Sequence, residues 1–214
     1  MSSPVQSNNA NSDSFFYVPD DRLYLATRAF LIFLQGLFKD RPAGQFRWSE
    51  NPDETEILIT DQLPENGQAV GKRPIIVTTR GAARYRNVSL DHVMERDMSG
   101  DALVYSDIIE TDMTFTCIAR EGVEAQNLAF TIFRMVPIFK GAIGRLGDMH
   151  WIGANMQIGP ESQGNQIIPG SGFSEWKIVQ VSVPFAIQDT VSVKSDFHTL
   201  LRAVNLHMEQ KNGA

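Results

Sequence analysis

Two long segments of the chain carry apolar residues at helical spacing. The first begins after Pro19, where Asp21 places negative charge at the helix start, and it ends at Arg41. Its repeating apolar positions are Leu23, Ala26, Phe30, Leu34 and Leu37. Further aromatic side chains make this helix apolar on more than one face, so either the domain or another subunit must cover it. The candidate interface residues on this helix are Phe30, Phe33 and Phe38.

The second helical segment covers residues 123–139. Its apolar face is formed by Ala125, Leu128, Ile132, Met135 and Phe139. Pro137 predicts that this helix kinks or ends there, because proline lacks a backbone N–H. Glycines at positions 141, 144 and 147 then predict a loose connection. A third helix is expected near the C-terminus, where Ser195 and Asp196 can cap it.

Alternation of apolar and polar residues predicts strands elsewhere in the chain. The expected strands are residues 56–60, 74–79, 103–120, 150–158 and 179–187. Residues 61–71 are expected to form a turn or a long hairpin loop. Residues 159–172 are rich in Gly and Pro and predict a protruding loop, longer than compact connections usually are.

The resulting order is one helix, three strands, a second helix, two strands and a last helix. Helices and strands are partly segregated, which favours an α+β fold with a mixed or antiparallel β-sheet flanked by two to three helices. We expect a flexible N-terminal arm at residues 1–18, because the segment is rich in Ser and Asn and lacks periodicity. An α+β domain follows at residues 19–192, and a C-terminal helix and tail at residues 193–214.

The composition of the 214 residues narrows the function classes. The net charge of −6 predicts no whole-chain attraction to nucleic acid or anionic membrane. Cys117 is the only cysteine, which favours a reducing compartment over a secreted one. The N-terminus shows no signal-peptide pattern, and the richest apolar stretch, residues 29–38, is about half the length of a membrane span. We therefore expect no membrane partner.

Recognisable catalytic and cofactor motifs are missing from the sequence. It contains no P-loop, no dinucleotide-binding fingerprint, no CxxC, no HExxH and no GxSxG. The four histidines are His92, His150, His198 and His207, and none has ligand spacing to another His or Cys. We expect no catalytic residue, no cofactor and no metal.

Cys117 and two acidic clusters could still act as catalytic residues. Cys117 could act as a nucleophile, although its place in an alternating strand favours a small buried apolar residue. The acidic clusters could supply acid–base pairs if they are buried, and otherwise they lie on a solvated face. These clusters are Asp107, Glu110 and Asp112, and Asp53, Glu54 and Glu56.

A basic segment stands out against the acidic chain. It contains Lys72, Arg73, Arg80, Arg84 and Arg86, and no acid occurs between positions 66 and 90. It is either a positive patch, facing an acidic neighbour or a DNA channel, or a set of ordinary surface arginines. We name these five residues as a candidate inter-subunit or channel patch.

The arrangement over residues 20–190, and the segment KRPIIVTTRG that ends at Gly81, resembles the tail terminator and head–tail joining (neck) proteins of tailed bacteriophages. The resemblance implies a homo-oligomeric ring, commonly of six copies, that caps the tail tube and joins it to the head. It implies a place in the virion tail or neck after assembly in the host cytoplasm. The implied partners are the chain itself, neighbouring neck, head-completion, tail-tube or sheath proteins, and passive contact with DNA in a lumen.

Two other functions remain open from the sequence. A monomeric adaptor would bind partners by adding a strand to an exposed sheet edge. A small hydrolase without a standard motif would use Cys117 or the group of Asp107, Glu110 and Asp112 within a concave pocket.

Overall fold

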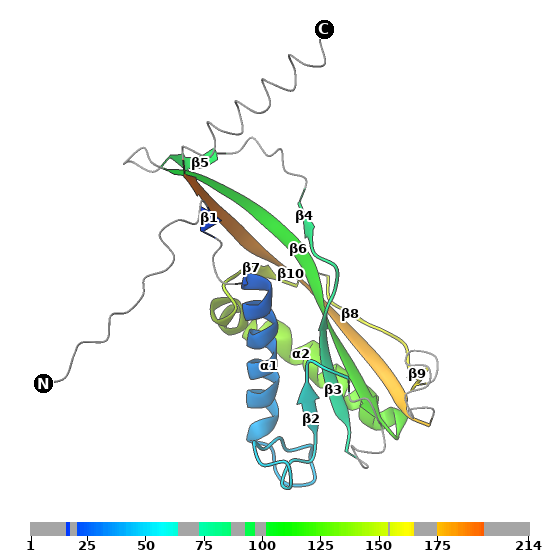
Figure 1. Ribbon diagram of the computed structural model, residues 1–214. Coiled ribbons are helices and arrows are strands. Elements are labelled where there is room, and N and C mark those ends of the chain that lie inside the picture. The colour runs from blue at the N-terminus through cyan, green and yellow to red at the C-terminus, as the bar shows by residue number, and fades with distance from the viewer. Residues whose placement is uncertain are drawn as a thin grey trace, which may run out of the picture. The chain divides into compact units, whose positions relative to one another are not determined.

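The computed structural model describes residues 16–17, 21–63, 73–86, 93–96, 102–153, 155–164 and 175–194 (Figure 1). Its elements are β1 (Phe16–Tyr17), α1 (Arg22–Lys39), β2 (Leu58–Thr60), β3 (Ile75–Arg80), β4 (Arg84–Tyr85), β5 (Val93–Arg96), β6 (Ala102–Ala119), α2 (Gly122–Leu146), β7 (Met149–Ile152), β8 (Gln157–Ile158), β9 (Ser162–Gln163) and β10 (Lys177–Lys194). The predicted α+β class is confirmed. The sheet is mixed, because β2 and β3 pair in parallel while the other pairs are antiparallel.

The chain divides into two compact units. The first comprises residues 1–20, 87–107 and 189–214, and the second comprises residues 21–86 and 108–188. In the first unit, β1 pairs with the end of β10, and β5 pairs with the start of β6. The expected arm at residues 1–18 and the expected helix after Ser195 lie outside the described residues, except for β1.

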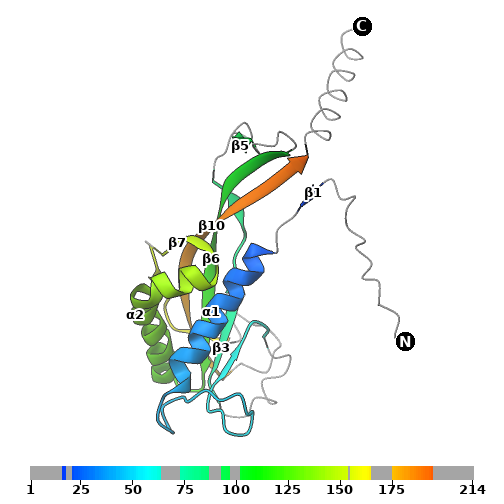
Figure 2. The same ribbon diagram turned by 90° about the vertical axis from the view of Figure 1, so that its left-hand side faces the viewer.

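The second unit places two helices against one face of the sheet. Its strands follow the order β10-β6-β3-β2, with β4 on β6 and with β7, β8 and β9 on β10. Helix α1 contacts β2 and β3, and α2 contacts β7 and β8. Figure 2 shows α1 and α2 side by side, with α2 on the side away from β3.

Helix α1 forms where the apolar spacing predicted it. The Asp21 carboxylate accepts a hydrogen bond from the Tyr24 N–H at 3.1 Å, which satisfies one free donor of the first turn. Phe30 is fully buried and meets Phe115 of β6 and Phe185 of β10 edge-to-face, with ring centroids 5.5 and 5.7 Å apart. These three aromatic rings join the helix to the middle of the sheet.

Helix α2 is longer than the sequence predicted. It runs through Pro137 to Leu146, so the helix does not end at the proline, and the expected loose connection at positions 141 and 144 is wrong. Ile143, in the last turn, is buried in the main core, and that packing offsets the low helix propensity of the two glycines. The helix ends at Gly147, whose N–H donates to the Ile143 carbonyl at 3.0 Å.

Two strand expectations also need correction. The expected strand 150–158 is broken into β7 and β8, because Gly153 has φ +51° and donates its N–H to the Pro184 carbonyl. A hairpin between the strands at 56–60 and 74–79 is ruled out by their parallel pairing, with Leu58 opposite Ile75. Within the expected loop 159–172, Ser162–Gln163 forms β9, and residues 165–174 lie outside the description.

The core has two parts, one on each face of the sheet. Alternating residues of β6 and β10, such as Phe115 and Val183, pack under the helices in the main cluster. The opposite face carries a smaller cluster of Ile75, Val77, Ile118, Trp176 and Ile178. Successive residues of a strand point to opposite faces of the sheet. Both faces are therefore buried near the start of β3, where Ile76 lies in the main cluster and Ile75 and Val77 lie in the smaller one.

Candidate interaction surfaces

The five predicted basic residues do not form one patch. Lys72 lies outside the described residues. Arg73 precedes β3 and donates from Nη1 to the Pro52 carbonyl at 2.6 Å. Arg80 ends β3 and is exposed. Since a strand rises about 3.3 Å per residue, roughly 20 Å of β3 separates Arg73 from Arg80.

Arg84 and Arg86 are brought onto an acidic residue that the sequence had placed in a different cluster. Strand β4 pairs with β6 so that Arg84 lies opposite Glu110. The Glu110 carboxylate lies 3.9 Å from Arg84 Nη2 and 3.3 Å from Arg86 Nε. The single carboxylate of Glu110 therefore balances about half of the positive charge of these two arginines. Sequence reasoning missed this because the pairing depends on a strand register 26 positions apart.

The acidic residues of β6 do not form a carboxylate pair. Glu110 faces the two arginines, whereas Asp112 accepts hydrogen bonds from the hydroxyls of Thr114 at 3.2 Å and Ser182 at 3.4 Å. Each carboxylate thus has its own partners across the sheet. This arrangement gives them a structural role in joining strands.

Cys117 is enclosed in the main core. Its side chain is fully buried, and this burial raises the pKa of the thiol well above its ordinary value. A substrate has no access to the sulfur, and the reactive thiolate is disfavoured. The hypothesis of a Cys117 nucleophile therefore loses its basis.

Metal-ligand clusters are not found among the described residues. His150 lies exposed in β7, and the other three histidines lie outside the description. None of the described helices is both long enough and apolar enough to cross a membrane.

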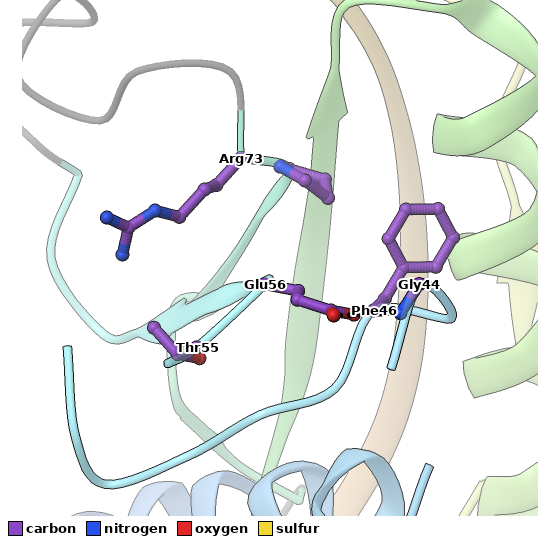
Figure 3. Close-up of a pocket in the computed structure, with 6 residues that line it drawn as sticks. Gly44, Phe46, Thr55, Glu56 and Arg73 are labelled. Atoms are coloured by element: carbon purple, nitrogen blue, oxygen red, sulfur yellow. Dashed lines mark hydrogen bonds between the residues drawn. The ribbon is translucent and has the colours of Figure 1, made fainter. Parts of the chain in front are cut away.

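A pocket of about 370 Å³ lies where the chain enters β2 and β3 (Figure 3). It is lined by Gly44, Phe46, Thr55, Glu56, Arg73 and Pro74. The Glu56 carboxylate accepts from the Gly44 N–H at 2.8 and 2.9 Å and from the Arg47 N–H at 3.0 Å. Figure 3 shows the Arg73 guanidinium pointing away from that carboxylate.

The Glu56 contacts explain the form of the pocket. Gly44 and Phe46 have φ values of +81° and +61°, which help turn backbone N–H groups toward one point. Hydrogen bonds from Gly44 and Arg47 lower the pKa of Glu56, because they favour the ionised form. These N–H groups could otherwise bind an anion, but the Glu56 carboxylate already occupies the place toward which they point. It thereby fixes the loop between α1 and β2.

The candidate interface residues of α1 are mostly internal. Phe30 and Phe38 are fully buried in the chain's own core, so these two rings offer no surface to another subunit, contrary to the expectation. Phe33 is partly buried and contacts Phe139 of α2, with centroids 5.8 Å apart. The rest of the domain, rather than a neighbour, covers this side of the helix.

The main exposed apolar surface lies on α2. Val123, Phe130 and Ile138 are 67, 53 and 68% exposed, so each of these apolar residues keeps more than half of its surface in contact with water. Arg134 lies over the Phe130 ring at 5.6 Å. With Arg145, these side chains fall within an arc of about 80° at ~100° per residue. We call Val123, Phe130, Arg134, Ile138 and Arg145 the outer face of α2.

Sequence reasoning overlooked the outer face because it assigned only the buried stripe of α2. The signal was present: from position 125 to 147 the helix carries Arg134, Lys140 and Arg145 and no acid. A second charge signal precedes β2, where Glu50, Asp53 and Glu54 are exposed in a turn. We call residues 50–54 the acidic turn.

Comparison with known proteins leaves the family open. No protein-family model matches the chain, and no curated protein matches it.

Proposed function

We propose that this protein is a structural virion component of a tailed bacteriophage. In this proposal it forms a homo-oligomeric ring, of six copies, at the neck or tail end. The ring terminates the tail tube and joins the tail to the head. Its neighbours are neck, head-completion, tail-tube or sheath proteins, and its lumen contacts DNA only passively.

The observation that carries the proposal is the exposed outer face of α2. A ring subunit must bury apolar surface against its neighbours as well as in its own core. Phe130 and Ile138 supply such surface after the main core is already complete. The resemblance of the segment from Arg73 to Gly81 to neck and tail terminator proteins supplies the particular place in the virion.

The ion pairs of Glu110 bear on the DNA contact. Because Arg84 and Arg86 share one carboxylate, their combined charge of +2 falls to about +1. Tight binding of DNA needs several cations on the phosphates, so this one remaining charge supports a passive lumen rather than a DNA-binding activity.

The test is the mass of the purified full chain, measured by light scattering, with negative-stain imaging. We expect a closed ring whose mass is a whole multiple of 23.9 kDa. A chain that stays monomeric at high concentration would contradict the proposal.

A double variant tests the observation itself. Phe130→Ser with Ile138→Ser should abolish the ring, because it removes apolar area that only a neighbour covers. Tyr24→Ser is the matched control, since Tyr24 is 59% exposed on α1 and outside the outer face. Assembly by the double variant would remove the basis on which we propose self-association.

A further inference from the structure

The outer face of α2 combines apolar area with unpaired positive charge. Arg134 and Arg145 are exposed, and no ion pair involves either one among the described residues. Arginine suits a protein interface because its planar group stacks on aromatic rings and binds carboxylates with two donors. A surface of this composition fits a partner that is acidic and able to cover Phe130 and Ile138.

The acidic turn has the complementary charge. Asp53 and Glu54 are exposed, and neither forms an ion pair among the described residues. Lys39 lies 3.4 Å from Glu50, and Arg73 donates to the neutral Pro52 carbonyl, so Arg73 keeps its positive charge beside the turn. Glu50, Asp53 and Glu54 together carry −3 against +2 from Lys39 and Arg73, so the turn keeps a net charge of about −1 for a partner.

These two surfaces lie at opposite ends of the second unit. Helix α2 packs on β7 and β8, which pair with β10 at one end of the strand order. The acidic turn precedes β2, which stands at the other end. In Figure 2, α2 and the cyan segment that leads into β2 lie on opposite sides of α1. One molecule therefore cannot join its own two surfaces.

We propose that the outer face of α2 in one copy docks on the acidic turn of the next copy, an inference that rests on the proposed ring function. Arg134 and Arg145 face Asp53 and Glu54 of the neighbour, and Phe130 and Ile138 lose their exposure to water. Two different surfaces meet, so the contact is heterologous. Repeated contacts of this kind close into a ring when the rotation between copies allows it.

Charge reversal on each side tests the pairing. Variant R134E/R145E carries two acidic surfaces, and variant D53K/E54K carries two basic ones. Each should remain monomeric alone, because like charges at the contact oppose association strongly. Their equimolar mixture should regain the wild-type mass. In a mixed ring, the acidic α2 of R134E/R145E meets the basic turn of D53K/E54K. At every other contact, the unchanged α2 of D53K/E54K meets the unchanged acidic turn of R134E/R145E. A ring of six accepts this alternation because six is even.

Controls separate the interface from the fold. The reversed residues are exposed, so circular dichroism and melting temperature should match the wild type. Variant R28E reverses an exposed arginine of α1 and should assemble normally. Assembly of either double variant alone would overturn the docking while leaving the ring function intact. Failure of the mixture to assemble would overturn it as well.

Two further measurements, the mass of the wild-type chain and its binding to lipid vesicles, distinguish this inference from the proposed function and from a membrane role. A wild-type chain without any oligomer would remove the ring function itself. If that monomer bound phosphatidylglycerol vesicles, but not phosphatidylcholine vesicles, and R134E/R145E did not, the outer face would be a lipid-binding surface instead. We expect no binding to either vesicle.

Discussion

At the residue scale, Glu56 does more than its half-buried position beside the acidic turn suggests. Its carboxylate gathers the N–H groups of Gly44 and Arg47, which lie in the loop after α1. Hydrogen bonds to an ionised acceptor are stronger than neutral ones. Glu56 therefore fixes the segment that leads from α1 into β2, including the approach to the acidic turn.

The protonation of Glu56 should make stability depend on pH. Its pKa is lowered below the ordinary 4.5, so its stabilising effect is fully present above that pH and is lost as the pH falls through the folded-state value. At pH 7, Glu56→Gln should lower the melting temperature by about 3 °C. The difference from the wild type should shrink when melts are repeated below pH 4.5.

Asp61→Asn provides the matched control for this prediction. Asp61 is exposed just after β2, five positions from Glu56 and outside the acidic turn. Its melting temperature should follow the wild type at every pH. If the melting temperature of Glu56→Gln stayed below that of the wild type by the same amount down to pH 3, the loss would not depend on charge. That result would contradict the assigned role of the carboxylate.

At the element scale, the last turns of α2 depend on two glycines of opposite character. A Cβ at Gly141 would meet nothing within 4 Å. A Cβ at Gly147 would lie 2.5 Å from Met149 Cε, 3.0 Å from Ala29 Cβ and 3.2 Å from Ala26 Cα. Gly147 thus permits the close approach of the end of α2 to α1.

The two alanine variants should therefore change stability in opposite directions. Gly141→Ala should raise the free energy of unfolding by about 0.5–1 kcal/mol, because alanine favours the helix. Gly147→Ala should lower it by about 1–2 kcal/mol, because α1 must move away. Chemical denaturation of both variants measures this. Equal effects of the same sign would show that α2 does not approach α1 as described.

The elements differ in how far the sequence could predict them. Helix α1 and the strands β6 and β10 follow from local periodicity, because each buries one stripe of its own residues. The continuation of α2 past Pro137 depends on burial of Ile143 against other elements, which local propensity does not contain. The parallel pairing of β2 with β3 and the two-residue strands depend in the same way on partners distant in sequence.

The candidate surfaces show the same division. Charge runs are visible in the sequence, but their partners are not: the register of β4 on β6 places Glu110 beside Arg84 and Arg86. Similarly, Phe30 and Phe33 look alike on a helix that is apolar all round. Packing distinguishes them, since Phe30 is fully buried against two aromatic rings of the sheet, whereas Phe33 is partly buried and contacts the Phe139 ring of α2.

At the scale of the whole molecule, the proposed contact between copies joins a central apolar area to surrounding charges. Exposed ion pairs are screened by salt, with a Debye length of about 10 Å at 0.1 M and about 3 Å at 1 M. Burial of Phe130 and Ile138 is not screened in this way, and salts excluded from protein surfaces strengthen it. The two contributions can therefore be separated by ionic strength.

We expect the ring to weaken when sodium chloride is raised from low to high concentration, with roughly a tenfold rise in the dissociation constant, because the charged rim is lost while the apolar centre remains. Sedimentation velocity over a range of protein concentrations measures this. Replacing the charged rim by neutral groups, in Arg134→Gln with Arg145→Gln, should weaken the ring at low salt and abolish most of its salt dependence. Phe130→Ser with Ile138→Ser should prevent assembly at every salt concentration, because charge alone cannot offset the cost of bringing subunits together. A wild-type ring indifferent to salt, or a neutral-rim variant that keeps the full salt response, would place the charged contact elsewhere on the molecule.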